Sequence, residues 1–486
     1  MQVKYTQDIG PIIEYVREHT MYRQAAAAAP FFLTMPFAGV VHALGAGITA
    51  GVSRDGFTEF LIDRDLMVKE AERVIVEISD KKTGLESSYT VWKKSVLMHD
   101  HFVAEMESGG KWKTKDDLLV DLNRFNDLML EMWKIPFIID CFDPIGDEVI
   151  TREVFSHCDG LTDEEKGVLL RNQELTTHDL LELDILRGLQ LEQKELDGLM
   201  QERWHWIQND YAGGRILPVE HFRAEIDSVK HSFPNHVQRQ QRIEALNGMT
   251  ERVVKQKQEV MDRYGLSEPQ QGIVYLFSFL TDWREERKRV NQMSFWVYQL
   301  FVDRLADFMQ IEPELIKMAD PREEIILGSD NPREILLQRR VTGVVYAEDT
   351  INNTTIISDD PNDVQLYKNT IAALMEEDRG ETVTGNVAQP GVVEGIVKII
   401  NSQEDFEKFH DGNILVAAMT RPELMPVIRR AAGIITDEGG VTCHAAVISR
   451  ELGIPCIIGT MNATAKLKDG DHVELNANSG EVRKIE

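Results

Sequence analysis

Residues 439–455 read GGVTCHAAVISRELGIP and place one histidine, His444, after two glycines and a threonine. The run before it, AAGIITDEGG, is typical of a buried strand that ends in a Gly-Gly loop. The run CHAAVISREL has the pattern of a short helix, with Gly453 as its stop signal and Pro455 just beyond. The sequence therefore predicts His444 in the first turn of a helix.

The first turn of a helix favours a negative group, because its N–H groups are free and the helix dipole is positive there. The same field disfavours an imidazolium, so we expect a neutral ring with one nucleophilic nitrogen. Gly439 and Gly440 let the backbone approach a phosphoryl group closely, and Thr442 can donate a hydrogen bond to it. We predict catalytic roles for His444 and Thr442 and phosphoryl-binding positions at Gly439, Gly440 and Cys443. The alternative is a histidine that caps a helix without chemistry.

The residues around His444 resemble those of a known family. The run 419–464 is similar to the phosphohistidine (swivelling) domain of the PEP-utilising enzymes, such as PEP synthase, pyruvate phosphate dikinase and rifampin phosphotransferase. The family's Gly-Gly-x-Thr-x-His-Ala-Ala element corresponds to 439–446, and its Arg-Glu-Leu-Gly-Ile-Pro tail lies within 449–455. The domain's opening matches NVAQPGVVEGIVKII, which contains Pro390, Gly391 and Gly395. The resemblance implies that His444 is phosphorylated in a catalytic cycle.

One position departs from the family pattern. The segment before the strand commonly has an acidic residue after its threonine, whereas here Thr420 is followed by Arg421. A cation in this loop changes how the domain can dock.

Length and composition describe a multidomain protein with ample core. The chain has 486 residues, 43% of them hydrophobic and 28% charged, which predicts two to four domains. The net charge of −28 argues against a nucleic-acid or anionic membrane surface, either of which needs a basic face. The four cysteines have neither CxxC nor zinc-ligand spacing, and the N-terminus has no signal-peptide core, so we expect free thiols in a cytoplasmic protein without a metal site.

An uncharged stretch at residues 25–52 allows two interpretations. It exceeds the roughly 20 residues of a membrane span, but Pro30, Pro36, His42 and four glycines interrupt it. We expect a buried helical hairpin there, and a membrane segment is the alternative.

The pattern divides the chain into three parts. Residues 1–340 are expected to form a mostly α-helical body that binds an acceptor. Residues 341–383 look like a hairpin and a helix that connect the body to the next domain. In residues 384–486, short β-runs alternate with one or two helices, which predicts an α/β domain. This C-terminal part is the swivelling phosphohistidine domain that the family resemblance implies.

The helical body resembles, more faintly, the substrate-binding region that precedes this domain in rifampin phosphotransferase. Arg284, Arg287 and Lys288 share one helix face, which could hold a phosphoryl group through charge-assisted bonds. The alternative is a solvated face paired with Glu285 and Glu286.

Two tryptophans of the same helix, Trp283 and Trp296, could line a substrate pocket, with core packing as the alternative. The histidines of HDH (99–101) and WHW (204–206) are interpreted as structural.

The order of the domains implies a division of labour. We find neither the ATP-grasp domain that precedes this region in rifampin phosphotransferase and PEP synthase nor a PEP/pyruvate barrel after it. The layout resembles that of the phosphohistidine-bearing subunit of phenylphosphate synthase, in which a separate subunit binds ATP. By that resemblance, a partner ATP-grasp subunit with Mg²⁺ and ATP phosphorylates His444. The domain then swings on a linker around residues 376–386, and the group passes to a small-molecule acceptor.

Two other functions remain open at this stage. One is a non-catalytic binding or scaffold protein that retains the mobile domain. The other is a different reaction in the helical body, although no nucleophile, base and orienting residue can be recognised there.

Overall fold

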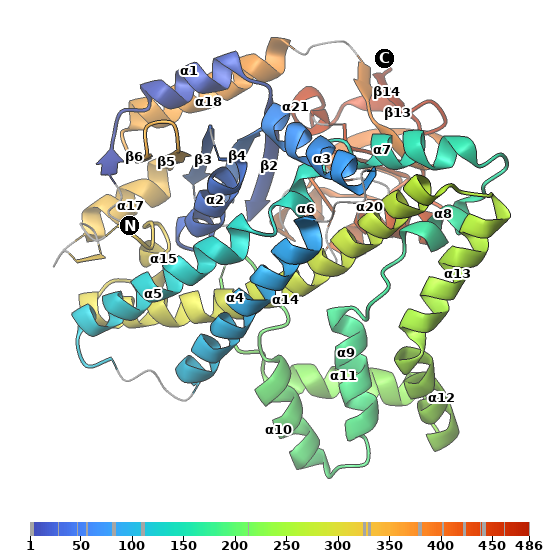
Figure 1. Ribbon diagram of the computed structural model, residues 1–486. Helices are drawn as coiled ribbons and strands as arrows, with labels where there is room; N and C mark the ends of the chain where they lie inside the picture. Colours follow the sequence, from blue (N-terminus) through green and yellow to red (C-terminus); the bar gives the residue numbers. More distant parts are fainter. Residues whose placement is uncertain are drawn as a thin grey trace.

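The structure of the protein is a computed structural model (Figure 1). It describes residues 4–27, 29–45, 47–54, 57–79, 84–107, 112–211, 213–323, 327–328, 332–377, 382–400, 403–420, 424–437, 439, 444–460 and 462–485.

A six-stranded sheet joins segments from opposite ends of residues 4–377. Its described strands lie in the order β1-β6-β5-β3-β4-β2; β1 is parallel to β6 and the other neighbours are antiparallel. The strands are β1 (Lys4–Thr6), β2 (Met21–Ala27), β3 (Ile48–Arg54), β4 (Phe57–Asp63), β5 (Val344–Asp349) and β6 (Thr354–Ser358).

Helices cover both faces of this sheet. Leu61 and Val345 pack with α1 (Gly10–Glu18) and α18 (Pro361–Glu377), which lie side by side in Figure 1. The alternate residues Phe60 and Tyr346 face the other way, into the core that contains α2 (Pro30–Leu44) and the helical body. This alternation follows from the two-residue repeat of a strand.

The sheet corrects two predictions. Residues 25–52 form neither a helical hairpin nor a membrane segment, but the end of β2, helix α2 and most of β3. The predicted hairpin at 341–358 exists as β5 and β6, but it is not a connector, because β5 pairs with β3 and β6 with β1. The strands were missed because the uncharged run was interpreted as one unit: its first part is alanine, and β3 buries the small polar residues Thr49 and Ser53 along with its apolar ones. Within the described parts of the chain, no helix is both long and apolar enough to cross a membrane.

The body between β4 and β5 is helical, as predicted. Its longest helix, α14, has 42 residues and spans roughly 63 Å at 1.5 Å per residue. The described elements are α3 (Arg64–Ser79), α4 (Gly84–Glu107), α5 (Lys115–Lys134), α6 (Ile138–Cys141), α7 (Gly146–Glu153), the 3₁₀ helix η1 (Phe155–His157), α8 (Asp163–Leu170), α9 (Thr177–Gly188), α10 (Gln193–Trp204), α11 (Val219–Ser232), α12 (His236–Asn247), α13 (Met249–Arg263), α14 (Glu268–Met309), α15 (Pro313–Ile316) and α17 (Arg333–Thr342).

The C-terminal domain is a second α/β unit, and its expected strands are confirmed. Its described strands form an eight-stranded sheet in the order β7-β14-β13-β9-β10-β11-β12-β8, in which β9 to β12 are parallel. Separate hydrophobic clusters lie on its two faces, and α20 belongs to one of them. The elements are β7 (Thr382–Thr384), β8 (Asn386–Gln389), β9 (Val392–Ile399), η2 (Gln403–Lys408), β10 (Ile414–Ala417), α19 (Met425–Ile428), β11 (Gly433–Thr436), α20 (His444–Leu452), β12 (Cys456–Ile458), α21 (Ala463–Lys466), β13 (His472–Asn476) and β14 (Glu481–Lys484).

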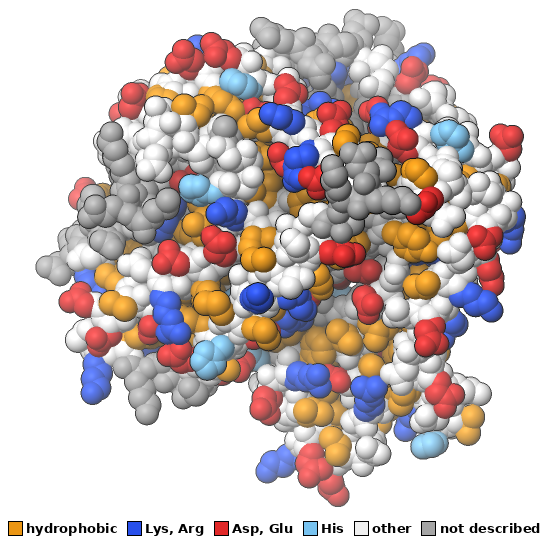
Figure 2. All heavy atoms as spheres, viewed as in Figure 1, with side chains coloured by type: hydrophobic (Ala, Val, Ile, Leu, Met, Phe, Trp, Pro, Cys, Tyr) orange, Lys and Arg blue, Asp and Glu red, His pale blue; other side chains and the backbone are white. Residues whose placement is uncertain are grey.

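The fold class is therefore the predicted one: a mostly α-helical body followed by a C-terminal α/β domain. The feature that the sequence did not predict is the six-stranded sheet at the start of the body. Figure 2 shows acidic and basic side chains interspersed over the visible face, without a continuous basic patch on it.

Candidate functional site

The backbone around His444 has the predicted strand–loop–helix form. Strand β11 ends at Thr436, and the nine-residue helix α20 begins at His444. Because β10, β11 and β12 are parallel, the loop after β11 lies at the carboxyl edge of these strands, where ligands of open α/β sheets bind. The side chain of His444 lies outside the described part of the chain, as do Gly440, Thr442 and Cys443. Their predicted roles stay predictions.

Gly439 is the described residue of the Gly-Gly pair. Its φ is +115°, which lies in the region that strongly favours glycine. A neighbouring glycine, Gly459, has a φ of +65°, and a Cβ there would lie 3.1 Å from the Gly439 carbonyl oxygen. The loops after β11 and β12 thus approach each other at positions that need glycine.

Packing explains the rest of the family motif. Ala445 and Ala446 are fully buried in the core beneath α20, where a larger side chain would not fit. Arg450 anchors the helix by donating from Nε to the Ala388 carbonyl oxygen at 3.0 Å. Pro455 packs against Gly391, where a Cβ would lie 2.6 Å from the proline Cγ. These residues hold α20, and therefore position 444, against the sheet.

Sequence analysis missed one buried carboxylate in this region, Asp437. It follows β11 directly and accepts hydrogen bonds from Thr460 Oγ1 at 3.2 Å and from the Thr464 backbone N–H at 3.0 Å, as well as from the Thr464 hydroxyl. Burial raises its pKa, while the bonds from Thr464 and the charge of Arg23 on β2 act in the opposite direction. Asp437 is a positioning residue that joins the loop before Gly439 to α21. Its place at the end of a predicted strand was the available signal.

On the face of α14 that was predicted to bind a phosphoryl group, two of the three cations are paired with aspartates. Arg287 is buried and makes two bonds to the Asp140 carboxylate, at 2.6 and 2.7 Å. Arg284 donates to Asp143 Oδ1 at 2.6 Å. Both guanidinium groups are thus neutralised by aspartates on or just after α6, so the structure does not support their assignment to phosphoryl binding. The alternative partner Glu286 is bound by Lys93 instead, so the pairing with Glu285 and Glu286 is not found either.

The third cation of that face, Lys288, is exposed. Within the described chain it has no ion pair, and its predicted role stays a prediction.

The two tryptophans that were predicted to line a substrate pocket lie in different surroundings. Trp283 is 1% exposed and lines a pocket of about 620 Å³, so it belongs both to the core and to a cavity wall. Trp296 is buried elsewhere, with its ring centroid 5.0 Å from that of His205, and does not line this pocket. Trp296 is therefore a core residue, which was the alternative interpretation of its sequence position.

A serine–histidine–aspartate arrangement occurs in the body, at His99. Its Nε2 lies 2.8 Å from Ser294 Oγ and its Nδ1 lies 3.1 Å from Asp100 Oδ1. His99 and Ser294 are fully buried, and burial lowers the pKa of the histidine. A substrate cannot reach either group, so the structural interpretation of this histidine agrees with the geometry.

Comparisons with known proteins identify the C-terminal region. Residues 409–480 match the family described as "PEP-utilising enzyme, mobile domain". The resemblance read from the motif is therefore confirmed for this region, which includes His444. It supports a phosphohistidine carrier domain of a phosphotransferase-type family.

The curated relatives match over the same part of the chain. A probable phosphoenolpyruvate synthase of Methanothermobacter thermautotrophicus is 54% identical over 100 residues, which cover 21% of this chain and 15% of that protein. The phosphoenolpyruvate synthase of Pyrococcus furiosus is 50% identical over 97 residues, covering 20% and 12%. The chain thus spans 15% or less of the length of these two relatives. A solved structure of Thermococcus kodakaraensis aconitase X shares 22% identity and covers 22% of this chain and 100% of its own, but its TM-score of 0.18 supports no conclusion.

Proposed function

We propose that this chain is the carrier component of a phosphotransferase. His444 accepts a phosphoryl group from ATP bound to a separate ATP-grasp subunit, and passes it to a small-molecule acceptor bound by the helical body. One observation carries the proposal: His444 begins a helix at the carboxyl edge of parallel strands, inside the region that matches the mobile domain. At this position the helix N-terminus favours a phosphoryl group beside the imidazole.

The loading step is a dikinase-type cleavage. The neutral Nε2 of His444 attacks the β-phosphorus of ATP, and a P–N bond forms as the bond to the oxygen shared with the α-phosphate breaks. AMP leaves with that oxygen. Water then removes the terminal phosphate, and phosphohistidine remains. Mg²⁺ belongs to the ATP site of the partner in this scheme, where it neutralises the phosphate charge.

In the transfer step, an acceptor hydroxyl attacks the phosphorus, the P–N bond breaks, and the hydroxyl proton leaves. The domain reaches the acceptor by moving on the linker predicted around residues 376–386, a range that overlaps the end of α18 and includes β7. The protein contributes positioning and positive charge in such a transfer. Lys288 is the remaining cation candidate on α14, because aspartates hold Arg284 and Arg287.

The test is phosphoryl transfer from ATP labelled at the β-phosphate, with the chain incubated with an ATP-grasp subunit as the proposed partner. We expect acid-labile label on the wild type and on a His410→Ala control, which removes an exposed histidine of the same domain. We expect none on His444→Ala. An unlabelled wild type, or equal label on His444→Ala, would instead favour a binding or scaffold protein that retains the domain.

A further inference from the structure

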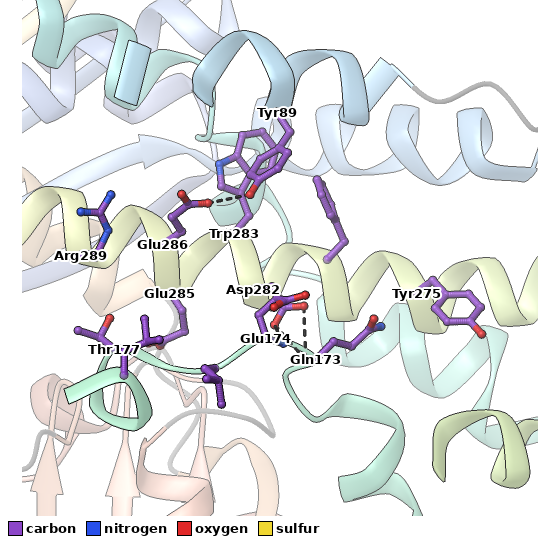
Figure 3. A pocket seen from close by; sticks show the side chains of 13 residues that line it. Tyr89, Gln173, Glu174, Thr177, Tyr275, Asp282, Trp283, Glu285, Glu286 and Arg289 are labelled. Atoms are coloured by element: carbon purple, nitrogen blue, oxygen red, sulfur yellow. Dashed lines mark hydrogen bonds between the residues drawn. The ribbon is translucent and has the colours of Figure 1, made fainter. Parts of the chain in front are cut away.

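A pocket of about 620 Å³ lies in the helical body. It is bounded by α4, α14 and the segment that leads into α9 (Figure 3). Its volume falls in the range of small-molecule sites, roughly 300–1,000 Å³. Trp283 was the one lining residue that the sequence indicated as a pocket residue.

One part of the lining is a packed group of aromatic rings. The ring centroid of Tyr89 lies 5.2 Å from that of Trp283 and 5.3 Å from that of Phe279, both edge to face. Phe279 and Trp283 are 5.6 Å apart. Because each ring is fixed by the other two, they form a preformed wall for an apolar or aromatic group. The indole N–H of Trp283 has no acceptor within the described chain, although the side chain is 99% buried.

The other part of the lining is acidic. Asp282, Glu285 and Glu174 have no ion pair with any residue that the structure describes. Asp282 accepts backbone N–H groups of Gln173 at 3.0 Å and Glu174 at 3.1 Å. Figure 3 shows these three carboxylates on the opposite side of α14 from Tyr89 and Trp283.

The remaining charges of the pocket are already compensated. Glu286 is bound by Lys93 and by the Tyr89 hydroxyl, which donates at 2.7 Å. Arg289 pairs with Asp100 at 3.5 Å. The uncompensated charge is therefore negative. Burial and the charge of Glu174 raise the pKa of Asp282, while the backbone N–H groups of Gln173 and Glu174 and the charge of Lys257 act in the opposite direction.

We propose that this pocket binds an organic cation, an ammonium group carried on an aromatic or other apolar frame. The rings of Tyr89, Phe279 and Trp283 contact the frame, and Asp282, Glu285 and Glu174, which line the same pocket across α14 from the rings, supply the net negative charge that attracts the ammonium group. Aromatic faces and carboxylates together form the environment that recognises alkylammonium groups. An anionic ligand is disfavoured by the same carboxylates. All of its described lining residues belong to the helical body, so binding of the cation can be measured apart from phosphoryl transfer.

Calorimetric titration of the full chain with benzyltrimethylammonium tests the proposal, with neopentylbenzene as the neutral ligand of the same shape. We expect the cation to bind about tenfold more tightly than the neutral ligand, which corresponds to one cation–π contact with partial charge compensation. Equal affinity for both ligands, or no detectable binding of the cation, overturns the proposal.

Variants locate the site. Glu174→Gln/Glu285→Gln removes two carboxylates from the pocket and should weaken binding of the cation about fivefold to tenfold, without weakening that of the neutral ligand. Glu202→Gln/Glu259→Gln makes the same charge change elsewhere on the body and should leave both affinities unchanged. An equal loss in both double variants would show general electrostatic attraction and overturn the site. His444→Ala should bind the cation normally, so failure of the carrier proposal and failure of this one are distinguishable.

Discussion

The two sheets of the molecule are assembled in opposite ways. All strands of the C-terminal sheet come from residues 382–484, and its two hydrophobic clusters contain residues of that region alone. The N-terminal sheet takes β1 to β4 from residues 4–63 and β5 and β6 from residues 344–358, and one face packs into the core of the helical body. The C-terminal domain is therefore contiguous and self-contained, whereas the N-terminal sheet depends on segments far apart in sequence.

The largest expected effect comes from truncation at the two boundaries. A chain that ends at residue 377 keeps the whole N-terminal sheet, and we expect it to remain helical and to unfold cooperatively. A chain that ends at residue 343 lacks the strands that pair with β1 and β3, and we expect it to aggregate. Circular dichroism and size-exclusion chromatography distinguish the outcomes. A stable, monomeric 1–343 fragment would contradict the proposed dependence.

The next effect contrasts a buried ion pair in the body with an exposed one in the C-terminal domain. Arg287→Met leaves the Asp140 carboxylate without its main partner, and we expect a loss of about 3–5 kcal/mol in the free energy of unfolding. Lys484→Met breaks the pair with Asp471 at the surface and should change stability by about 1 kcal/mol or less. Urea denaturation measures both. Similar losses would show that burial does not separate the two pairs.

We expect the stability of the helical body to depend on pH. Lys257 is fully buried, donates to the Leu169 carbonyl oxygen at 3.0 Å, and burial lowers its pKa from 10.5 to about 8. Between pH 8 and 10.5 the unfolded chain therefore binds more protons at this residue than the folded protein does. The wild type should gain up to about 3 kcal/mol of stability relative to Lys257→Met as the pH rises through this window. A difference that stays constant with pH would show that the lysine titrates normally.

The smallest effect concerns the packing of the family motif. In Gly391→Ala the new Cβ meets the Pro455 ring, so we expect a loss of about 1–3 kcal/mol in the C-terminal domain. Pro455→Ala in the same chain removes the nearest atom and should recover part of the loss. Thermal unfolding of the two variants provides the measurement. If the double variant is less stable than the sum of the single losses predicts, the contact is not the cause.

The same contrast explains what the sequence could predict. The runs around β9 to β14 could be placed because each strand is short, is bounded by glycine or proline, and pairs with segments nearby in the chain. The strand β3 could not, because it buries the small polar residues Thr49 and Ser53 as well as its apolar ones, and its partner β5 lies almost 300 residues away.

At the candidate site, the sequence predicted where residues lie better than it predicted which residues they bind. His444 begins a helix as its glycines indicated, and Trp283 lines a pocket. The partners of Arg284 and Arg287 lie about 145 residues upstream, on or just after a four-residue helix, and no local spacing indicated them. Asp437 was overlooked because its hydrogen-bond donors, Thr460 and Thr464, come from the loop after β12 and from α21, which the strand pattern does not mark.

The chain leaves the N-terminal sheet at Asp63 and returns to it at Val344, and these two ends flank a single strand, β3. They do not meet: Asp63 lies two residues beyond Leu61, which pairs with Ala50, whereas Val344 pairs with Ser53, so the two ends are about 17 Å apart along the strands and about 10 Å apart across them. A helical lobe of any length can be inserted at this point if its two ends have this spacing, so the lobe is an insertion into the sheet. Exchange of this lobe would leave the strands of both sheets in place, so the helical body can diverge in sequence while the C-terminal domain stays unchanged.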